Sequence, residues 1–277
     1  AQAAQPVTDR RLTPANGRVA AMHLAGQVMA DRFVAGTAMR LMRPVTDLCA
    51  SPDGPRDRQL LLGADVTVYE ELEGWSFLQA SDGYVGYVRS DTLGTADTPT
   101  HRVGTAATHA YAAEDFKSPN LLALPFGAQV KVIDERQKFF ETNVGFVPKK
   151  HLRPLDRPFS DPATVAQLFF GVPYLWGGNS TYGIDCSGLI AGALTACDIG
   201  CPADSDMQRN GLGWDLTDPL QRGDLIFWQG HVGMMVDAHT MIHANAHHMA
   251  TVYEPIETAI TRIAAQGDGP VLARKRL

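Results

Sequence analysis

The sequence predicts an α+β protein in which two small β-barrels precede a larger domain that combines one buried helix with an antiparallel sheet. Three observations lead to this fold class. A pattern of glycine turns and alternating valines occurs twice, a Pro-containing segment follows it, and a helix-like apolar run with three strand-like runs comes last. A chain of 277 residues, 45% of them hydrophobic, is long enough to bury more than one core.

The repeat predicts the two barrels. Each copy has Gly-Ala-x-Val-x-Val, then Gly-aromatic-Val, then a leucine seven residues after the second glycine. The two copies are residues 63–68, 86–88 and Leu93, and residues 127–132, 145–147 and Leu152. Valines that alternate with polar residues between glycine turns are typical of half-buried strands, and tandem barrels are the simplest arrangement of such repeats.

The domain boundaries follow from these segments. We expect a partly helical extension at residues 1–33, the first barrel at 34–96, the second at 97–155 and the last domain at 156–277. The Pro-bearing stretch "RPLDRPFSDP" is the expected linker. In "DPATVAQLFFG", Asp161 is the predicted N-cap, Pro162 the first helical residue and Gly171 the end of the segment.

The rest of the last domain is expected to contain one buried helix and three strands. The run "SGLIAGALTAC" after Cys186 has the small and apolar composition of a helix that is buried all round. Strand-like runs follow at residues 224–228, 231–237 and 240–244.

Composition excludes several partners. A net charge of -6 without a Lys/Arg block argues against nucleic acid and against a polybasic membrane contact. No stretch approaches the apolar length of a spanning helix, and the first residues lack a signal-peptide pattern, so we expect a cytosolic protein unless a leader preceded Ala1. We separately expect a monomer. Four cysteines are few for a disulfide scaffold, and Cys49, Cys197 and Cys201 are expected to be reduced and structural.

Cys186 has a position that suits a nucleophile. A thiol attacks carbonyl carbon as the thiolate, and unpaired N–H groups at a helix N-terminus favour that anion. The glycines at positions 177, 178, 183 and 188 keep the approach free of bulk. The alternative is that Cys186 is simply a small buried hydrophobic residue.

Two histidines strengthen the nucleophile hypothesis. His231 begins one predicted strand and His243 lies toward the end of the next, so antiparallel pairing could place them side by side. A nucleophilic cysteine needs an imidazole within reach and a third group to orient that imidazole. A lone histidine in a strand is more often structural.

The motifs "YLWGG", "DCSGL", "GDLIFW", "HVG" and "MIHA", in this order, resemble those of the NlpC-type papain-like cysteine peptidases that cut peptidoglycan peptides. The resemblance covers about residues 161–277. It implies a papain-like domain with Cys186 as nucleophile, His231 as general base and acid, and His243 as the orienting residue. It also implies that the backbone N–H of Cys186, with Tyr174, stabilises the oxyanion.

The repeats look like bacterial SH3-like domains, and the whole arrangement is similar to that of γ-D-glutamyl-L-diamino acid endopeptidases. This resemblance implies hydrolysis of the γ-D-Glu-L-diamino acid bond in peptides with a free N-terminal L-Ala, in cell-wall peptide recycling, without a cofactor. The substrate-binding residues that it implies are Asp185, Ser187, Trp176, Asp204, Ser205, Tyr84 and Asp53.

Several of these residues have a structural alternative. Asp185 and Ser205 could equally be helix N-caps, and Tyr84 could be a core aromatic. Asp53 is chosen from a loop that also holds Asp47 and Asp57. Relatives often have arginine where this chain has Ala203, which puts a contact with a substrate carboxylate in doubt.

Three other functions remain open. His239, His243 and His247 recur every four residues, so a helix there would suit a metal hydrolase, although no HExxH context accompanies them. The barrels would also suit a non-catalytic wall-binding protein. The same scaffold would further suit a general cell-wall endopeptidase, an amidase or an acyltransferase.

Overall fold

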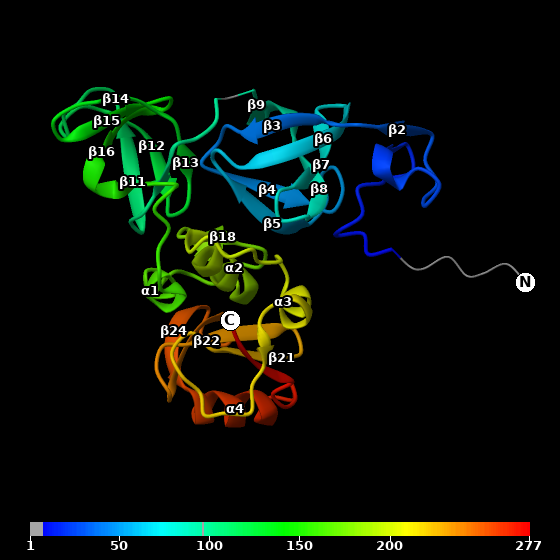
Figure 1. Ribbon diagram of the computed structural model, residues 1–277, viewed down its shortest axis with the longest axis vertical. Coiled ribbons are helices and arrows are strands. Elements are labelled where there is room, and N and C mark those ends of the chain that lie inside the picture. The colour runs from blue at the N-terminus through cyan, green and yellow to red at the C-terminus, as the bar shows by residue number, and fades with distance from the viewer. Residues whose placement is uncertain (1–7, 96) are drawn as a thin grey trace, which may run out of the picture. The chain divides into compact units, whose positions relative to one another are not determined.

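The two valine-rich repeats form two separate groups of strands in the computed structural model, which describes residues 8–95 and 97–277 (Figure 1). The chain divides into two units, residues 1–96 and 97–277. Within the described ranges, no helix has the length and apolar character needed to cross a membrane. Residues 1–7 of the predicted extension lie outside the described residues.

The first unit is a β-barrel with a short extension. A seven-stranded sheet has the order β5-β4-β8-β7-β6-β3-β9, and β1 and β2 pair in parallel before it. The only helical turn of residues 8–33 is the 3-10 helix η1 (Met22–Leu24). The strands are β1 (Val19–Ala21), β2 (Arg32–Val34), β3 (Thr37–Leu41), β4 (Val45–Cys49), β5 (Arg56–Leu61), β6 (Asp65–Leu72), β7 (Trp75–Ala80), β8 (Val85–Arg89) and β9 (Leu93–Gly94), with the 3-10 helix η2 (Ser90–Thr92) before β9.

Alternation along β6 explains why this segment is a strand. Val66 and Val68 are buried, whereas Asp65 is exposed, so one face of the strand enters the core. Gly63, with φ of 81°, makes the turn into β6 that the repeat predicts.

The second unit begins with the other barrel. It comprises a sheet of order β13-β10-β17 and a sheet of order β12-β11-β16-β15-β14. The strands are β10 (His101–Val103), β11 (Ala107–Tyr111), β12 (Asn120–Pro125), β13 (Gln129–Val130), β14 (Val132–Glu135), β15 (Phe139–Thr142), β16 (Gly145–Pro148) and β17 (Leu152–Pro154), with the 3-10 helix η3 (Lys149–His151) between the last two.

The last domain is built on one antiparallel sheet of order β20-β25-β21-β22-β23-β24, accompanied by four helices and a β18-β19 hairpin. The helices are α1 (Pro162–Gln167), α2 (Cys186–Ala196), α3 (Ser205–Gly211) and α4 (Ile256–Ala265). The strands are β18 (Asn179–Ser180), β19 (Gly183–Ile184), β20 (Trp214–Asp215), β21 (Leu225–Trp228), β22 (His231–Met235), β23 (Thr240–Asn245), β24 (Ala250–Pro255) and β25 (Ala273–Arg276).

The two faces of this sheet carry different cores, with α2 and α4 on opposite sides of it (Figure 1). On one side, Phe227 and Ile242 pack in a cluster with Leu189 of α2. On the other side, Met241 and Trp228 pack in a cluster with Ile263 of α4. Successive strand residues point to opposite faces, so the neighbours Met241 and Ile242 enter different cores.

The second barrel is packed against the last domain. Phe126, in the loop after β12, belongs to the core cluster of α1 and α2, and its ring lies 5.6 Å from that of Phe169. The buried Arg102 of β10 donates from Nη1 to the carbonyl oxygen of Thr195 in α2 at 3.2 Å. These contacts explain why residues 97–277 form one unit.

The predicted fold class, α+β with two barrels before a domain of one buried helix and an antiparallel sheet, is confirmed. The first helix begins as expected, because the carboxylate of Asp161 accepts from the N–H of Ala163 at 3.1 Å. The α-helical part ends at Gln167, and tighter turns continue as far as Gly171, whose φ is 83°. All four cysteines are free thiols.

Candidate active site

Cys186 is the first residue of α2, and Asp185 caps this helix. The backbone of Asp185 is extended, and its Oδ1 accepts from the N–H of Gly188 at 2.8 Å and from the hydroxyl of Ser187 at 3.2 Å. Its Oδ2 accepts from the N–H of Gly177 at 2.9 Å. One buried carboxylate therefore ties the glycine-rich approach to the start of the helix and fixes where the thiol lies.

The approach itself requires glycine. A Cβ at Gly178 would overlap the carbonyl oxygen of Gly183, so this position accepts no side chain. Tyr174, four residues earlier, donates its N–H to the carbonyl oxygen of Met249 at 3.1 Å. The chain thus runs close against its neighbours just before it reaches Cys186.

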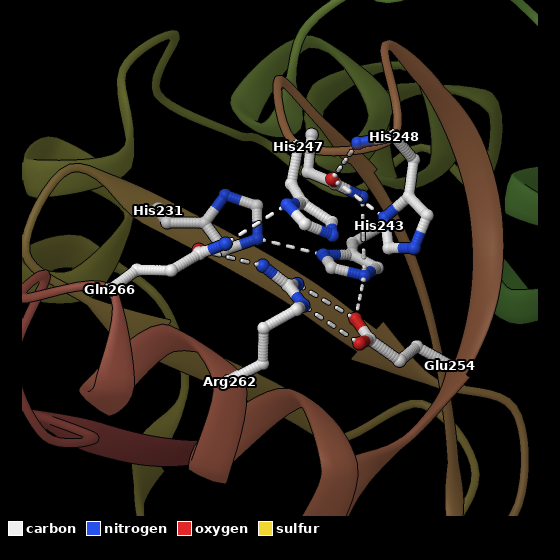
Figure 2. A network of polar contacts seen from close by, with 8 residues as sticks. His231, His243, His247, His248, Glu254, Arg262 and Gln266 are labelled. Atoms are coloured by element: carbon white, nitrogen blue, oxygen red, sulfur yellow. Dashed lines mark hydrogen bonds and ion pairs between the residues drawn. The ribbon is translucent and has the colours of Figure 1, made fainter.

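The structure brings His231 and His243 together. The antiparallel register of β22 and β23, with Met235 opposite Met241, places both histidines on the α4 side of the sheet. Nε2 of His231 lies 2.8 Å from Nδ1 of His243 (Figure 2). The pairing expected from their spacing is therefore present.

The line of polar contacts continues beyond His243. Its Nε2 lies 2.9 Å from Oε1 of Glu254 on β24, and Arg262 of α4 holds both oxygens of that carboxylate at 2.9 Å (Figure 2). Glu254 pairs with Met241 across the two strands, so it is a diagonal neighbour of His243 on the same face. His243 is fully buried, and Glu254 is 6% exposed.

Glu254 and Arg262 were not among the residues predicted from the sequence. The available signal was weak, because it consisted of one acidic residue at an inward position of the strand "ATVYEP" and one arginine eight residues later. Nothing in the local pattern says that these two residues meet each other or His243.

Electrostatics keeps the histidines neutral and the glutamate ionised. Burial, together with the neighbouring His243 and Arg262, lowers the pKa of His231 to about 3. Burial also lowers the pKa of His243, although Glu254 opposes the shift. Burial acts to raise the pKa of Glu254, but the hydrogen bonds from His243 and Arg262 outweigh it, so the pKa of this carboxyl is well below its usual range.

Thiol and imidazole open into the same cavity, which has a volume of about 220 Å³. Its lining includes Tyr174, Cys186, Gly230, His231 and Asn245. Sγ of Cys186 lies 3.9 Å from the carbonyl oxygen of Gly230, the residue directly before His231. A thiol, a neutral imidazole and a helix N-terminus around one cavity can carry out nucleophilic attack on a carbonyl, proton transfer and stabilisation of an oxyanion.

The helix required by the metal-hydrolase alternative is not formed. His239 precedes β23, His243 lies in it and His247 follows it, so the three do not share a helix face. Possible ligand atoms of His243, His248 and Glu254 do lie within 4.8 Å of one another. However, Arg262 already neutralises the carboxylate, and the Nε2 atom of His243 already contacts it, so we interpret this group as a hydrogen-bond network.

The other predicted substrate residues are spread more widely. Asp204 and Ser205 are the N-cap and first residue of α3, and Asp204 makes no side-chain cap bond. Neither these two residues nor Trp176, which is 70% exposed, is among the described residues that line the cavity. Asp185 and Ser187 are buried beneath the helix start, where both contribute to its cap.

Tyr84 and Asp53 belong to the first unit. Tyr84 is 3% exposed, which suits the core alternative, and Asp53 has a positive φ of 54° in the turn between β4 and β5. Their contact with substrate stays a prediction.

Two families match the chain. Residues 171–263 match the NlpC/P60 family, and residues 48–93 match the bacterial dipeptidyl-peptidase Sh3 domain. The first match contains Cys186, His231, His243 and Glu254.

Curated relatives match with different coverage. A γ-D-glutamyl-L-lysine dipeptidyl-peptidase of Bacillus cereus is 36% identical over 107 residues, which are 35% of this chain and 32% of that protein. The dipeptidyl-peptidase 6 of Lysinibacillus sphaericus is 26% identical over 230 residues, which are 73% of this chain and 85% of that protein. The chain thus matches about a third of the first relative's length and most of the second's.

Among solved structures, an NlpC/P60 family protein from Bacillus cereus has a TM-score of 0.74 and 20% identity, over 87% of this chain and 99% of the other. At this identity the likeness supports the fold alone.

Proposed function

Because residues 171–263 belong to the NlpC/P60 family of peptidases and residues 48–93 form a bacterial dipeptidyl-peptidase SH3 domain, we propose that this protein is a cysteine endopeptidase that hydrolyses the γ-D-Glu-L-diamino acid bond of peptidoglycan-derived peptides. Its substrates carry a free N-terminal L-Ala, as in the recycling of cell-wall peptides. One observation carries the proposal: Cys186, at the start of a helix, shares a cavity with His231, which is hydrogen-bonded to His243. The name of the Bacillus cereus relative supports the substrate class, and the name of the Lysinibacillus sphaericus relative supports a dipeptidyl-peptidase.

The proposed first step is attack by the thiolate of Cys186 on the carbonyl carbon of the γ-linked D-Glu. Nε2 of His231 faces His243, so Nδ1 is the nitrogen that takes the thiol proton. The S–C bond forms as the carbonyl π-electrons move to oxygen, and donors at the start of α2, with Tyr174, stabilise this oxyanion. Collapse of the tetrahedral intermediate breaks the C–N bond, and His231 gives its proton to the leaving amine.

The second half of the reaction uses water. The thioester on Cys186 is attacked by a water molecule whose proton goes to Nδ1 of His231, and the thiolate leaves. The products are a dipeptide with a free carboxylate and a peptide that begins with the diamino acid. A transferase on the same scaffold would pass the acyl group to an amine instead, so release of free L-Ala-D-Glu distinguishes the two.

Selection of a free amino terminus is the finer part of the proposal. A carboxylate next to the thiol would form a charge-assisted bond with an α-ammonium group, and Asp185 is the carboxylate closest in sequence to the nucleophile. Asp53 of the first unit is the second candidate. A site built to pair an ammonium group rejects an acylated amine by up to about 10⁴-fold.

The test compares L-Ala-γ-D-Glu-diaminopimelate with its N-acetylated form, with mass spectrometry of the products. We expect cleavage of the free tripeptide to L-Ala-D-Glu, and a value of kcat/KM lower by about 10³- to 10⁴-fold for the acetylated peptide. Asp185→Asn and Asp53→Asn should narrow this difference. Equal values of kcat/KM would mean that the protein is a general cell-wall endopeptidase.

Two inhibitors separate the proposal from a metal hydrolase. Iodoacetamide should abolish cleavage, whereas a chelator such as EDTA should leave it intact. The opposite result would contradict cysteine catalysis.

A further inference from the structure

A line of polar side chains extends from His231 through the buried His243 to the ion pair of Glu254 and Arg262, and Arg262 lines the same cavity as His231. The contacts are His231 Nε2 to His243 Nδ1 at 2.8 Å and His243 Nε2 to Glu254 Oε1 at 2.9 Å. Arg262 then binds Glu254 through Nε to Oε2 and through Nη2 to Oε1, each at 2.9 Å. A buried carboxylate is expensive to desolvate unless its oxygens are hydrogen-bonded, and here both are. The ion pair is therefore part of the construction of the site.

The ion pair at the end of the line favours one direction of hydrogen bonding. An ionised carboxylate can only accept and a guanidinium can only donate. Nε2 of His243 must then carry the hydrogen that faces Glu254, which leaves Nδ1 of His243 as an acceptor. Nε2 of His231 supplies the hydrogen for that acceptor, so the lone pair of the neutral His231 is on Nδ1.

Asn245 favours the opposite arrangement, in which Nδ1 of His243 carries the hydrogen, but its contact with His243 is weaker than that of Glu254. Its Oδ1 accepts from the backbone N–H of His248 at 2.9 Å, which turns its Nδ2 toward Nε2 of His243 at 3.3 Å. An amide donor there would favour a bare Nε2. The carboxylate of Glu254 is closer, at 2.9 Å, and charged, and a hydrogen bond to a charged acceptor is about twice as strong.

We propose that Glu254, held by Arg262, is a positioning residue that fixes the hydrogens of His243 and His231, so that Nδ1 of His231 is the atom that accepts the thiol proton. The proposal rests on the proposed function in that it assigns this proton transfer to His231. Glu254 does not touch the substrate and acts through His243. Arg262 has the supporting role of keeping the carboxylate ionised and in one orientation, so α4 takes part in the site.

The first test is spectroscopic and needs neither a substrate nor a variant of Glu254. In the ¹⁵N-labelled wild-type protein, long-range ¹H–¹⁵N spectra distinguish a protonated from a bare ring nitrogen. Signals are assigned by loss in His243→Gln and His231→Gln. We expect His243 to carry its hydrogen on Nε2 and to have a bare Nδ1. A hydrogen on Nδ1 of His243 would overturn the proposal.

The second test is kinetic and uses a matched pair of variants. Glu254→Gln keeps the shape but removes the charge, and its amide can present either an acceptor or a donor to His243. We expect kcat on the tripeptide to fall by about ten- to a hundredfold with KM within about twofold of wild type. Glu257→Gln, the same change at an exposed position in the first turn of α4, should have no effect. An unchanged kcat in Glu254→Gln would contradict the proposal.

A third variant separates orientation from stability. Glu254→Gln leaves the charge of Arg262 uncompensated beside two histidines, and adding Arg262→Gln removes it. We expect the double variant to recover part of the lost kcat, whereas a residue that only supports the fold would make the double variant worse.

Should the wild type show Nε2–H on His243 and yet not cleave the tripeptide, the proposed function would fail and the positioning role would stand.

Discussion

The thiol side and the imidazole side of the site are held in different ways. On the thiol side, Asp185 binds the N–H groups of Gly177 and Gly188, all within twelve residues of the chain. On the imidazole side, side-chain contacts run from His231 on β22 to His243 on β23. They continue to Glu254 on β24 and to Arg262 on α4. The first is a local backbone cap, and the second is a line of side chains joined by tertiary structure.

The local cap fixes the position of the sulfur, whereas the line of side chains fixes which nitrogens of the two histidines carry hydrogen. A capped helix start needs only a carboxylate and a nearby N–H group, and it fixes where the sulfur lies. An imidazole can donate or accept from either nitrogen, so its orientation must be set by something that can do only one of the two. In this protein the charged end of the line, Glu254, meets that requirement.

Removal of the thiol tests the local side and has the largest expected effect. Cys186→Ala and Cys186→Ser should lower the cleavage rate by at least about 10³-fold, because no other group forms the thioester. The melting temperature should shift by only a few degrees, since the change in size is small. Circular dichroism and the tripeptide assay measure the two quantities.

The matched control is Cys197→Ser, at the other end of α2, which should keep its activity. Burial raises the pKa of Cys197, so this thiol is less reactive. Activity above a tenth of wild type in either Cys186 variant would exclude it as the nucleophile.

The two histidines test the imidazole side. His231→Ala removes the proton carrier, and kcat should fall by about 10³-fold or more. His243→Gln should lose only about ten- to a hundredfold, because an amide oxygen can still accept from Nε2 of His231. The assay is kcat on the free tripeptide. Equal losses would rule out a purely orienting role for His243.

Acid should lower the free energy of unfolding, because histidines that are neutral in the folded protein bind protons in the unfolded chain. This is the smallest of the expected effects. Burial lowers the pKa of His231 from 6.5 to about 3, so between these values the unfolded chain binds a proton that the folded protein excludes. The free energy of unfolding should therefore fall as the pH drops below about 6.5, by up to about 1.4 kcal/mol per pH unit for this residue.

Urea unfolding at pH 7.5 and at pH 5.5 measures this dependence. His231→Gln should flatten it, whereas His239→Gln, in an exposed turn, provides the control. Burial also lowers the pKa of His243, so this residue contributes in the same direction. If wild type and His231→Gln lost equal stability on acidification, burial of a neutral His231 would not be the cause of the pH dependence of the free energy of unfolding.

Local patterns explain what could be predicted from the sequence. The cap at Asp161, the helix that starts at Cys186 and the strands that carry His231 and His243 all depend on neighbours a few residues away. The meeting of these two histidines followed from a short connection between antiparallel strands.

What could not be predicted depends on tertiary packing. Glu254 and Arg262 become significant only because α4 crosses the face of the sheet that carries His243.

The contact of Phe126 with Phe169 has a practical consequence for fragments of the protein. Residues 156–277, cut at the boundary expected from the linker, would lack both Phe126 and the guanidinium of Arg102 that binds the end of α2. Such a fragment would present Phe159 and Phe169 to water, which invites aggregation on expression. A catalytic fragment should therefore begin near residue 97 and carry the second barrel as the natural cover of its own core.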